Sequence, residues 1–204
     1  MKNILPVLAM LAMILGVLSV SAAGQTSRDG ATAPRINKFD VAVNFTYKVA
    51  KIASTTNRFV MPGGSLDAAY DFGGKARGLS LAVDVNGESK SNIEPGVSLT
   101  QISVLGGARY TFRIAAHNPH AVDLYGQFLG GGVFASNSLF PGLPSATSSA
   151  NSSAIQLGGG ANLRLTHRIA LRLLEADFIS THLPNSTNQR QYDVRFSNGV
   201  VFRF

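Results

Sequence analysis

The chain contains no cysteine, which excludes a disulfide framework, a cysteine nucleophile, a thiolate metal site and a lipid-modified N-terminal cysteine. Charged residues are scarce at 14%, against roughly 25% in an average soluble domain. No run of polar helix-forming residues is long enough to predict an amphipathic helix. The length of 204 residues suits a single domain, and the 21 glycines indicate that it is built of strands and turns.

The charge balance is basic, with a net charge of +7 and a pI of about 10.1. Such a balance can indicate nucleic-acid binding when the cations line a helix or accompany an RNA-binding aromatic motif. Here the lysines and arginines are scattered over predicted strands, and neither feature is present. The sequence therefore predicts no nucleic-acid partner.

The N-terminus has the pattern of a secretory signal peptide. Lys2 is followed by an apolar run from Ile4 to Val20, and Ser21 and Ala23 supply small residues before a cleavage site. An uncleaved membrane anchor is the alternative, but the run is at the lower limit for a spanning helix and no positive cluster follows. We expect residues 1–23 to be the signal peptide, 24–38 a flexible lead-in, and 39–204 the folded domain.

The folded domain shows eight segments in which apolar and polar residues alternate, the periodicity of strands. Each is long enough to cross a bilayer as a tilted strand, which needs roughly 9–11 residues. The even number, and connections that alternate between long and short, predict an all-β, eight-stranded, antiparallel, up-and-down transmembrane barrel. The predicted strands are Phe39 to Val49, Gly64 to Gly73, Gly78 to Asn86, Val97 to Ala115, Val122 to Ala135, Ala154 to Leu165, Ile169 to His182 and Arg190 to Phe204.

Alternation alone does not say which face is inside, because a soluble sandwich buries its apolar face and a membrane barrel exposes it. The polar faces hold aspartates and arginines in nearly equal number, as ions enclosed in a narrow lumen would require. Eight strands enclose a space that side chains can just fill. We therefore predict a lumen network, and not a wide channel, of Asp67, Asp71, Asp84, Arg109, Arg113, Asp123, Arg164, Asp193, Arg195 and Arg203.

The seventh strand departs from this pattern, because Glu175 and Asp177 have the same parity as Leu171 and Leu173. A β-bulge near Leu173-Leu174 would return both acids to the lumen. The alternative is that the acids lie near the outer rim, where burial is slight. We favour the bulge.

The closing strand has a fully aromatic and aliphatic face except at Asn198, and an apolar strand end of this kind invites edge pairing in a soluble protein. It is similar to the last strand of bacterial outer-membrane barrels, which serves as their assembly signal and usually ends in Phe. The resemblance assigns that signal to Tyr192, Val200, Phe202 and Phe204.

Further segments carry the resemblance. LGGARYTF from Leu105, DLYGQFLGGG from Asp123, LGGG from Leu157, ALRLLEADF from Ala170 and the closing SNGVVFRF are similar in order and spacing to the OmpA/OmpX-like porin family. The resemblance implies an outer-membrane location in a Gram-negative cell. The implied partners are outer-membrane lipid, lipopolysaccharide, the barrel-assembly machinery and periplasmic chaperones. The periplasmic peptidoglycan-binding domain of OmpA has no counterpart in this chain.

Catalytic and metal sites are weakly signalled. His117 and His120 fall in one predicted turn and His167 in another, and strand parity separates His182 from Glu175. The glycine runs lack the lysine and helix of a phosphate loop. We predict no catalytic residue, no metal and no cofactor. Four loop cations are candidates for lipopolysaccharide phosphates or are simply solvated: Lys51, Arg58, Lys90 and Arg190.

The predicted function is therefore that of a monomeric, non-catalytic surface or envelope-integrity protein. A small passive pore for ions or small solutes is the first alternative. A lipid A-modifying enzyme is the second.

Overall fold

The computed structural model describes residues 38–51, 58–73, 76–94, 97–114, 121–140, 147–184 and 190–204. The predicted signal peptide and all of the predicted lead-in except Lys38 lie outside the described residues. Among the described residues no helix is long and apolar enough to span a membrane.

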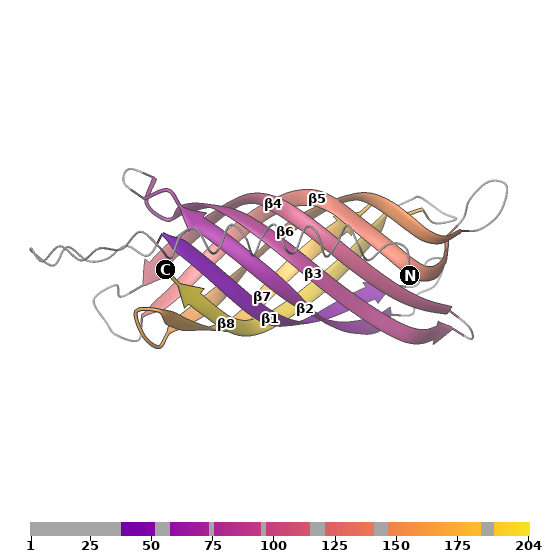
Figure 1. Ribbon diagram of the computed structural model, residues 1–204, viewed down its shortest axis with the longest axis horizontal. Coiled ribbons are helices and arrows are strands. Elements are labelled where there is room, and N and C mark those ends of the chain that lie inside the picture. Colours follow the sequence, from indigo (N-terminus) through magenta and orange to yellow (C-terminus); the bar gives the residue numbers. More distant parts are fainter. Residues whose placement is uncertain are drawn as a thin grey trace, which may run out of the picture. The chain divides into compact units, whose positions relative to one another are not determined.

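The described chain forms one closed barrel in which each strand pairs with its sequence neighbours (Figure 1). Every pairing is antiparallel, including that of the first strand with the last. The predicted eight-stranded up-and-down barrel is confirmed. The strands are β1 Phe39–Lys51, β2 Arg58–Asp71, β3 Leu79–Glu94, β4 Val97–Ile114, β5 Val122–Phe140, β6 Thr147–Arg164, β7 Ile169–Thr181 and β8 Gln191–Arg203.

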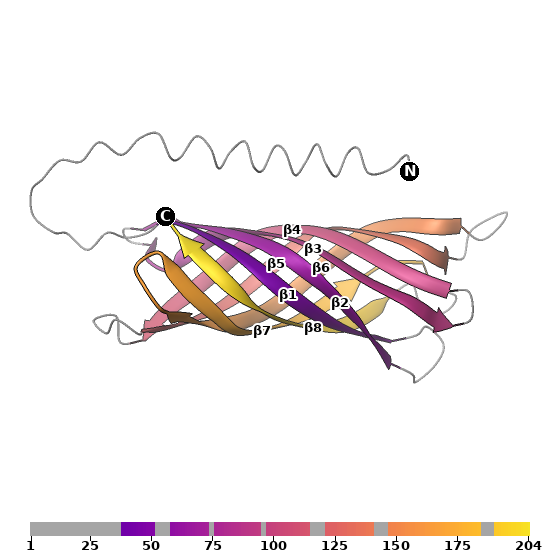
Figure 2. The ribbon, with the colours of Figure 1, turned by 60° about the horizontal axis from the view of Figure 1, so that its bottom comes forward.

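The barrel closes where its first and last strands meet. The backbone N–H of Lys38 donates to the carbonyl of Phe204 at 2.9 Å, and the N–H of Phe204 donates to the carbonyl of Phe39 at 2.8 Å. Both ends of the barrel sequence therefore lie at one end of the barrel (Figure 2). We call this the closure end, and we call the opposite end, where Lys51 of β1 pairs with Arg58 of β2, the hairpin end.

The predicted alternation of long and short connections is wrong. The polar segments expected to be loops at 51–63, 87–96 and 136–153 are largely strand, so that only 95–96 separates β3 from β4. The reason is that apolar alternation stops where lipid contact stops. The backbone ladder continues past that point, because Ser, Thr and Asn pair as well as apolar residues in a hairpin surrounded by water.

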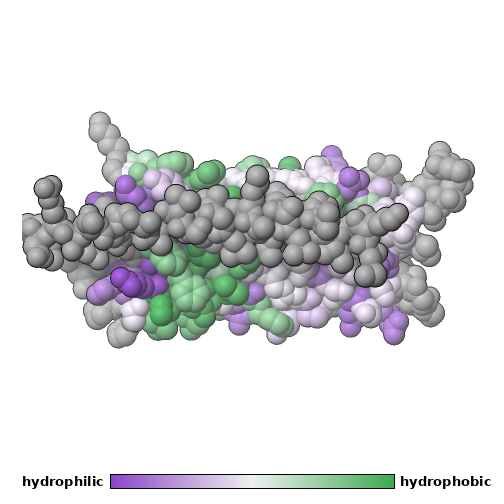
Figure 3. All heavy atoms as spheres, viewed as in Figure 1, coloured by the Kyte–Doolittle hydropathy of each residue, from purple (hydrophilic) through white to green (hydrophobic). Residues whose placement is uncertain are grey.

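The outer wall of the barrel is apolar and the inner wall is mostly polar, the reverse of a soluble sandwich. Phe45 is 51% exposed, Phe112 60% and Leu157 60%. Figure 3 shows apolar side chains gathered over the half of the barrel nearest the closure end, with polar side chains more frequent toward the hairpin end. Because a large exposed apolar belt is stable only in lipid, the barrel is a transmembrane one.

The predicted β-bulge in β7 is confirmed. Ala161 pairs with Leu174 and Asn162 with Arg172, which leaves Leu173 without its own partner on β6. The register toward β8 shifts in the same place, between Arg172 and Glu175. Leu173 and Leu174 both face outward, and Glu175 is buried inside. The extra residue thus restores the acids of β7 to the lumen.

Candidate functional site in the barrel lumen

The middle of the lumen is crossed by arginine side chains that join strands lying on opposite sides. Arg109 of β4 binds the Asp67 carboxylate of β2 with both terminal nitrogens, one of them at 2.9 Å from Oδ1. Arg172 of β7 donates to the same carboxylate at 3.2 Å. Because β7 and β2 are three strands apart around the ring, this contact spans the interior.

Gln127 extends this centre toward the bulged strand. Its carbonyl oxygen accepts from Arg109 Nε at 3.0 Å, and its amide nitrogen donates to Glu175 at 2.6 Å and to Asp177 at 3.2 Å. Glu175 also accepts from Arg172 Nη1 at 2.6 Å. The bulge is therefore what allows β7 to supply both a cation and two acids to one network.

Arg195 of β8 forms a second crossing. It donates to Asp84 of β3, and its Nη2 lies 2.9 Å from Asp177 Oδ2 and 3.2 Å from Gln156 Oε1. Its Nη1 lies 3.9 Å from Glu88. Since Asp177 contacts both Arg195 and Gln127, the two crossings form one continuous polar network.

Toward the hairpin end the pairing becomes looser. The Lys48 ammonium donates to Gln101 Oε1 at 2.6 Å, but it lies 3.7 Å from Asp193 and 3.9 Å from Glu88. Apolar side chains also lie on the lumen side of the wall, including Leu105, which is the register partner of Asp84 and is 1% exposed. The members of this apolar cluster are Ala69, Ala82, Leu105, Leu129, Val133, Ala135, Phe140, Ala154 and Leu183.

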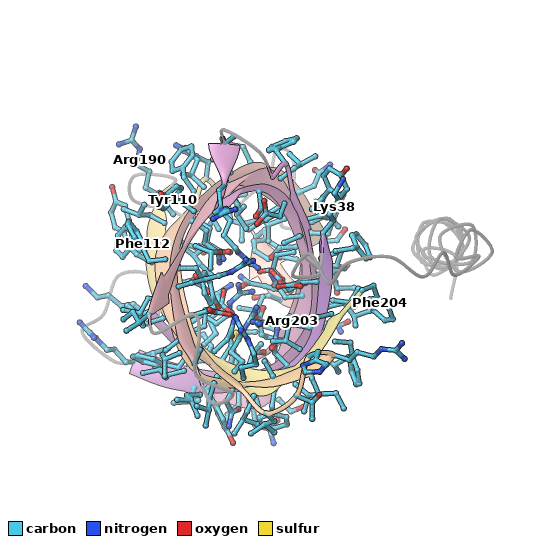
Figure 4. All side chains as sticks on the ribbon, turned by 90° about the vertical axis from the view of Figure 1, so that its left-hand side faces the viewer. Lys38, Tyr110, Phe112, Arg190, Arg203 and Phe204 are labelled. Atoms are coloured by element: carbon cyan, nitrogen blue, oxygen red, sulfur yellow. The ribbon has the colours of Figure 1, made fainter. Side chains whose placement is uncertain are left out.

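Toward the closure end the pairs are separate and more hydrated. Arg203 contacts Asp123 at 2.7 Å, and Arg164 contacts the same aspartate at 3.4 Å. Arg113 lies 3.6 Å from Asp71, with 35% of its side chain exposed. A cavity of about 20 Å³ lies here, room for roughly one water molecule. In Figure 4, a view from this end, Arg203 points into the lumen.

All ten residues predicted for the lumen lie on its wall. Each contacts a side chain of opposite charge, which is Lys48 for Asp193 and another member of the ten for the other nine. The residues that link these pairs into a continuous network were not among the ten predicted. Glu175 and Asp177 were expected in the lumen only through the bulge, and the others were missed: Lys48, Glu88, Gln101, Gln127, Gln156 and Arg172. Strand parity could have found Lys48, which alternates with the outward Tyr47 and Val49. Glu88 was missed because it fell in an expected loop.

The residues weighed for catalysis do not come together where the structure describes them. His182 is exposed at the end of β7, with its Nδ1 3.4 Å from Ser153 Oγ, whereas Glu175 is buried in the lumen. His167 lies exposed in the turn before β7. His117 and His120 fall outside the described residues. Among the described side chains no group of three His, Cys, Asp or Glu could hold a metal ion.

Fold, apolar exterior and charged interior define an eight-stranded barrel of the bacterial outer-membrane class. No family model matches the sequence, and no curated protein matches it either. Among solved structures the chain is similar to Neisserial surface protein A (NspA), with 18% identity, 81% of this chain and 97% of that chain covered, and a TM-score of 0.58.

The chain is also similar to Ail, the attachment invasion locus protein of Yersinia pestis. That match has 15% identity, covers 83% of this chain and 100% of Ail, and has a TM-score of 0.52. A second structure of Ail, in complex with the heparin analogue sucrose octasulfate, matches with 14% identity and a TM-score of 0.54. At these identities the likeness establishes the fold.

Proposed function

We propose that this protein is a monomeric, non-catalytic barrel of the outer membrane that contributes to envelope integrity and conducts no solute through its lumen. The observation that carries the proposal is the arginine crossing of the lumen. Arg109, Arg172 and Arg195 are 4%, 1% and 1% exposed, and each contacts acids on another strand. A passage for ions would need these pairs to separate, and separating buried charges costs several kcal/mol.

Planar-bilayer recording tests the sealed lumen. The wild-type protein is expected to give no steady unit conductance. A variant with Arg172→Ala and Arg195→Ala, which removes both long crossings, is expected to conduct. Steady conductance by the wild type would instead support the alternative, a small passive pore.

The envelope role has its own test in cells that lack the gene. We expect such cells to become more sensitive to detergent and to large antibiotics, and the wild-type gene to restore resistance.

The remaining alternative, a lipid A-modifying enzyme, predicts a change in the mass spectrum of lipid A on deletion. An unchanged spectrum is expected if the barrel is non-catalytic.

The implied partners are outer-membrane lipid, lipopolysaccharide, periplasmic chaperones and the barrel-assembly machinery. At the hairpin end, Lys51 and Arg58 are direct cross-strand partners and both are exposed. Like charges directly opposite each other destabilise a sheet unless an anion lies between them. We assign this pair to lipopolysaccharide phosphates and expect Lys51→Gln with Arg58→Gln to reduce the lipopolysaccharide that copurifies. Lys90→Gln on a neighbouring hairpin is the single-cation control.

A further inference from the structure

Positive and negative side chains are balanced along part of the lumen only. At the closure end three acids are met by three arginines, with the exposed Lys38 beside them: Asp40, Asp71, Asp123, Arg113, Arg164 and Arg203. At the first crossing, Arg109 and Arg172 are matched by Asp67 and Glu175. The remaining set has four acids and two cations: Asp84, Glu88, Asp177, Asp193, Lys48 and Arg195. We call this set the acidic cluster.

The acidic cluster is shut off from water. Each of its six side chains is at most 3% exposed. Residues 52–57, 95–96, 141–146 and 185–189, which connect the strands at the hairpin end, include no charged residue. The described cations at that end are exposed: Lys51, Arg58, Lys90 and Arg190. Two negative charges of the cluster are therefore in excess over the buried cations that the structure describes.

One pair of carboxylates shares the Arg195 guanidinium. Arg195 donates to Asp84, and its Nη2 lies 2.9 Å from Asp177 Oδ2. Asp177 also accepts from the Gln127 amide at 3.2 Å, whereas Asp84 Oδ1 is buried without a hydrogen-bond partner. On β2 the direct cross-strand partner of Asp84 is another acid, Asp67. One cation therefore offsets only one charge of this pair.

The second pair shares Lys48. Its ammonium lies 3.9 Å from Glu88 and 3.7 Å from Asp193. The hydrogen bond of this ammonium goes to the neutral Gln101, at 2.6 Å. Arg195 Nη1 is 3.9 Å from Glu88 but belongs to the guanidinium that the first pair already shares. The second pair thus also carries one negative charge too many.

We propose that the acidic cluster holds two protons at neutral pH, one shared by Asp84 and Asp177 and one shared by Glu88 and Asp193. A carboxylate without a counter-charge in a dry interior takes up a proton, and two carboxylates at one site share it. A metal ion does not supply the missing charge, because among the described side chains no group of three His, Cys, Asp or Glu could hold one. The inference rests on the sealed lumen of the proposed function.

Folding then takes up two protons from water, because the carboxyls of an unfolded chain are ionised above about pH 5. The folded barrel is stabilised by protons that the unfolded chain lacks, so its stability falls as pH rises. The lumen is consequently sealed most firmly in neutral or mildly acidic medium.

Infrared spectroscopy tests the bound protons directly, because the carbonyl stretch of a protonated carboxyl is separate from the bands of carboxylates and of the backbone. The folded protein is measured at neutral pH in a detergent that has no ester group. We expect the wild type to show this band. Asp84→Asn with Asp193→Asn removes one carboxyl from each pair and should abolish it. Asp71→Asn, at the balanced closure end, is the matched control and should retain it.

Urea unfolding in lipid vesicles gives an independent measurement. Relative to the Asp84→Asn and Asp193→Asn variant, the unfolding constant of the wild type should increase about 100-fold per pH unit between about pH 7 and pH 9, as the release of two protons requires. Comparing the two proteins cancels the titration of groups elsewhere. Glu88→Gln with Asp177→Asn removes the other member of each pair and should behave as the first variant does.

A wild type that lacks the carboxyl band, or whose stability has the same pH dependence as that of both double variants, overturns the proposal. Stabilisation by sodium ions in the absence of the band would mean that a bound cation neutralises the cluster instead. Planar-bilayer recording separates this inference from the proposed function. A wild type that conducts has a hydrated lumen and refutes both, whereas a sealed wild type without the band refutes the bound protons alone.

Discussion

Tyr125 of β5 and Gly160 of β6 are directly opposed partners on the lumen side of the wall. The missing side chain at Gly160 leaves the space that the Tyr125 ring occupies, since a Cβ there would lie 2.7 Å from the hydroxyl oxygen and 2.9 Å from the ring. Two guanidinium groups also lie over the ring, with Arg109 at 4.6 Å and Arg172 at 5.1 Å from its centroid. The tyrosine thus connects the wall to the arginine crossing.

Gly160→Val should destabilise the barrel by about 1–3 kcal/mol, because the added side chain overlaps both the Tyr125 ring and the Leu174 carbonyl oxygen and a close-packed interior tolerates little extra volume. Urea unfolding in lipid vesicles, followed by tyrosine fluorescence, measures the change. Gly132→Ala is the control, because the nearest atom to its new Cβ lies 3.9 Å away. Equal stability of the two variants would show that the Tyr125 ring and the Leu174 backbone can both shift to admit the new side chain.

Asp67→Asn should cost about 3–5 kcal/mol, because it removes the carboxylate shared by Arg109 and Arg172. The buried Arg109 then has no carboxylate partner, and Arg172 keeps only Glu175. Asp71→Asn is the matched change at the hydrated closure end, where its partner Arg113 is partly exposed, and should cost less than about 1 kcal/mol. The same urea titration compares them. A cost for Asp67→Asn as small as that of Asp71→Asn would mean that the centre is hydrated.

Deleting Leu173 should be tolerated. The residue is the extra one of the bulge, so its removal joins Arg172 to Leu174 while Glu175 keeps its pairing with Gly160 and Ser197. Deleting Ala176 instead forces either Glu175 or Asp177 to face lipid, which is unfavourable at mid-membrane depth. Gel mobility before and after boiling reports barrel formation. We expect the first deletion to retain the heat-dependent shift and the second to lose it.

Phe204→Ser should lower the amount of protein inserted in the outer membrane if the closing strand is the assembly signal. The ring is 64% exposed, so its loss removes no lumen contact. Phe112→Ser changes a ring of similar exposure, 60%, on a strand outside the signal. Surface labelling of intact cells compares the two. Equal levels for both variants would leave Phe204 with no special part in assembly.

Strand number, order and facing were predictable from the sequence because lipid and lumen impose opposite demands on alternate residues. This alternation alone predicts that Phe45 faces lipid and Asn44 faces the lumen. The bulge in β7 was predicted because the alternation is interrupted there. Strand ends were not predictable, because a hairpin in water such as the one between β5 and β6 needs no apolar face.

The ion-pair partners could also not be predicted from the sequence. Arg195 contacts Asp84, 111 positions earlier in the chain, and which strands face each other across the lumen depends on the stagger of the closed barrel. Leu105 shows a further limit. It shares the strand face of the polar residues of β4 yet is buried inside the barrel, because apolar groups pack beside the polar ones on the lumen side of the wall.

Because the acids lie inside the wall, the charge that the protein presents to its surroundings differs between the unfolded and the folded state. As an unfolded chain in transit it shows aspartate and glutamate alongside lysine and arginine. Once the barrel has closed, the described carboxylates lie on the lumen side together with the cations that pair with them, such as Lys48, Arg172 and Arg195. The described cations that stay exposed are Lys51, Arg58, Arg77, Lys90, Arg168 and Arg190. Insertion therefore makes the molecule more basic toward its surroundings without a change of composition, and the folded form in neutral detergent should be retained longer on a cation exchanger than the same chain held unfolded in urea.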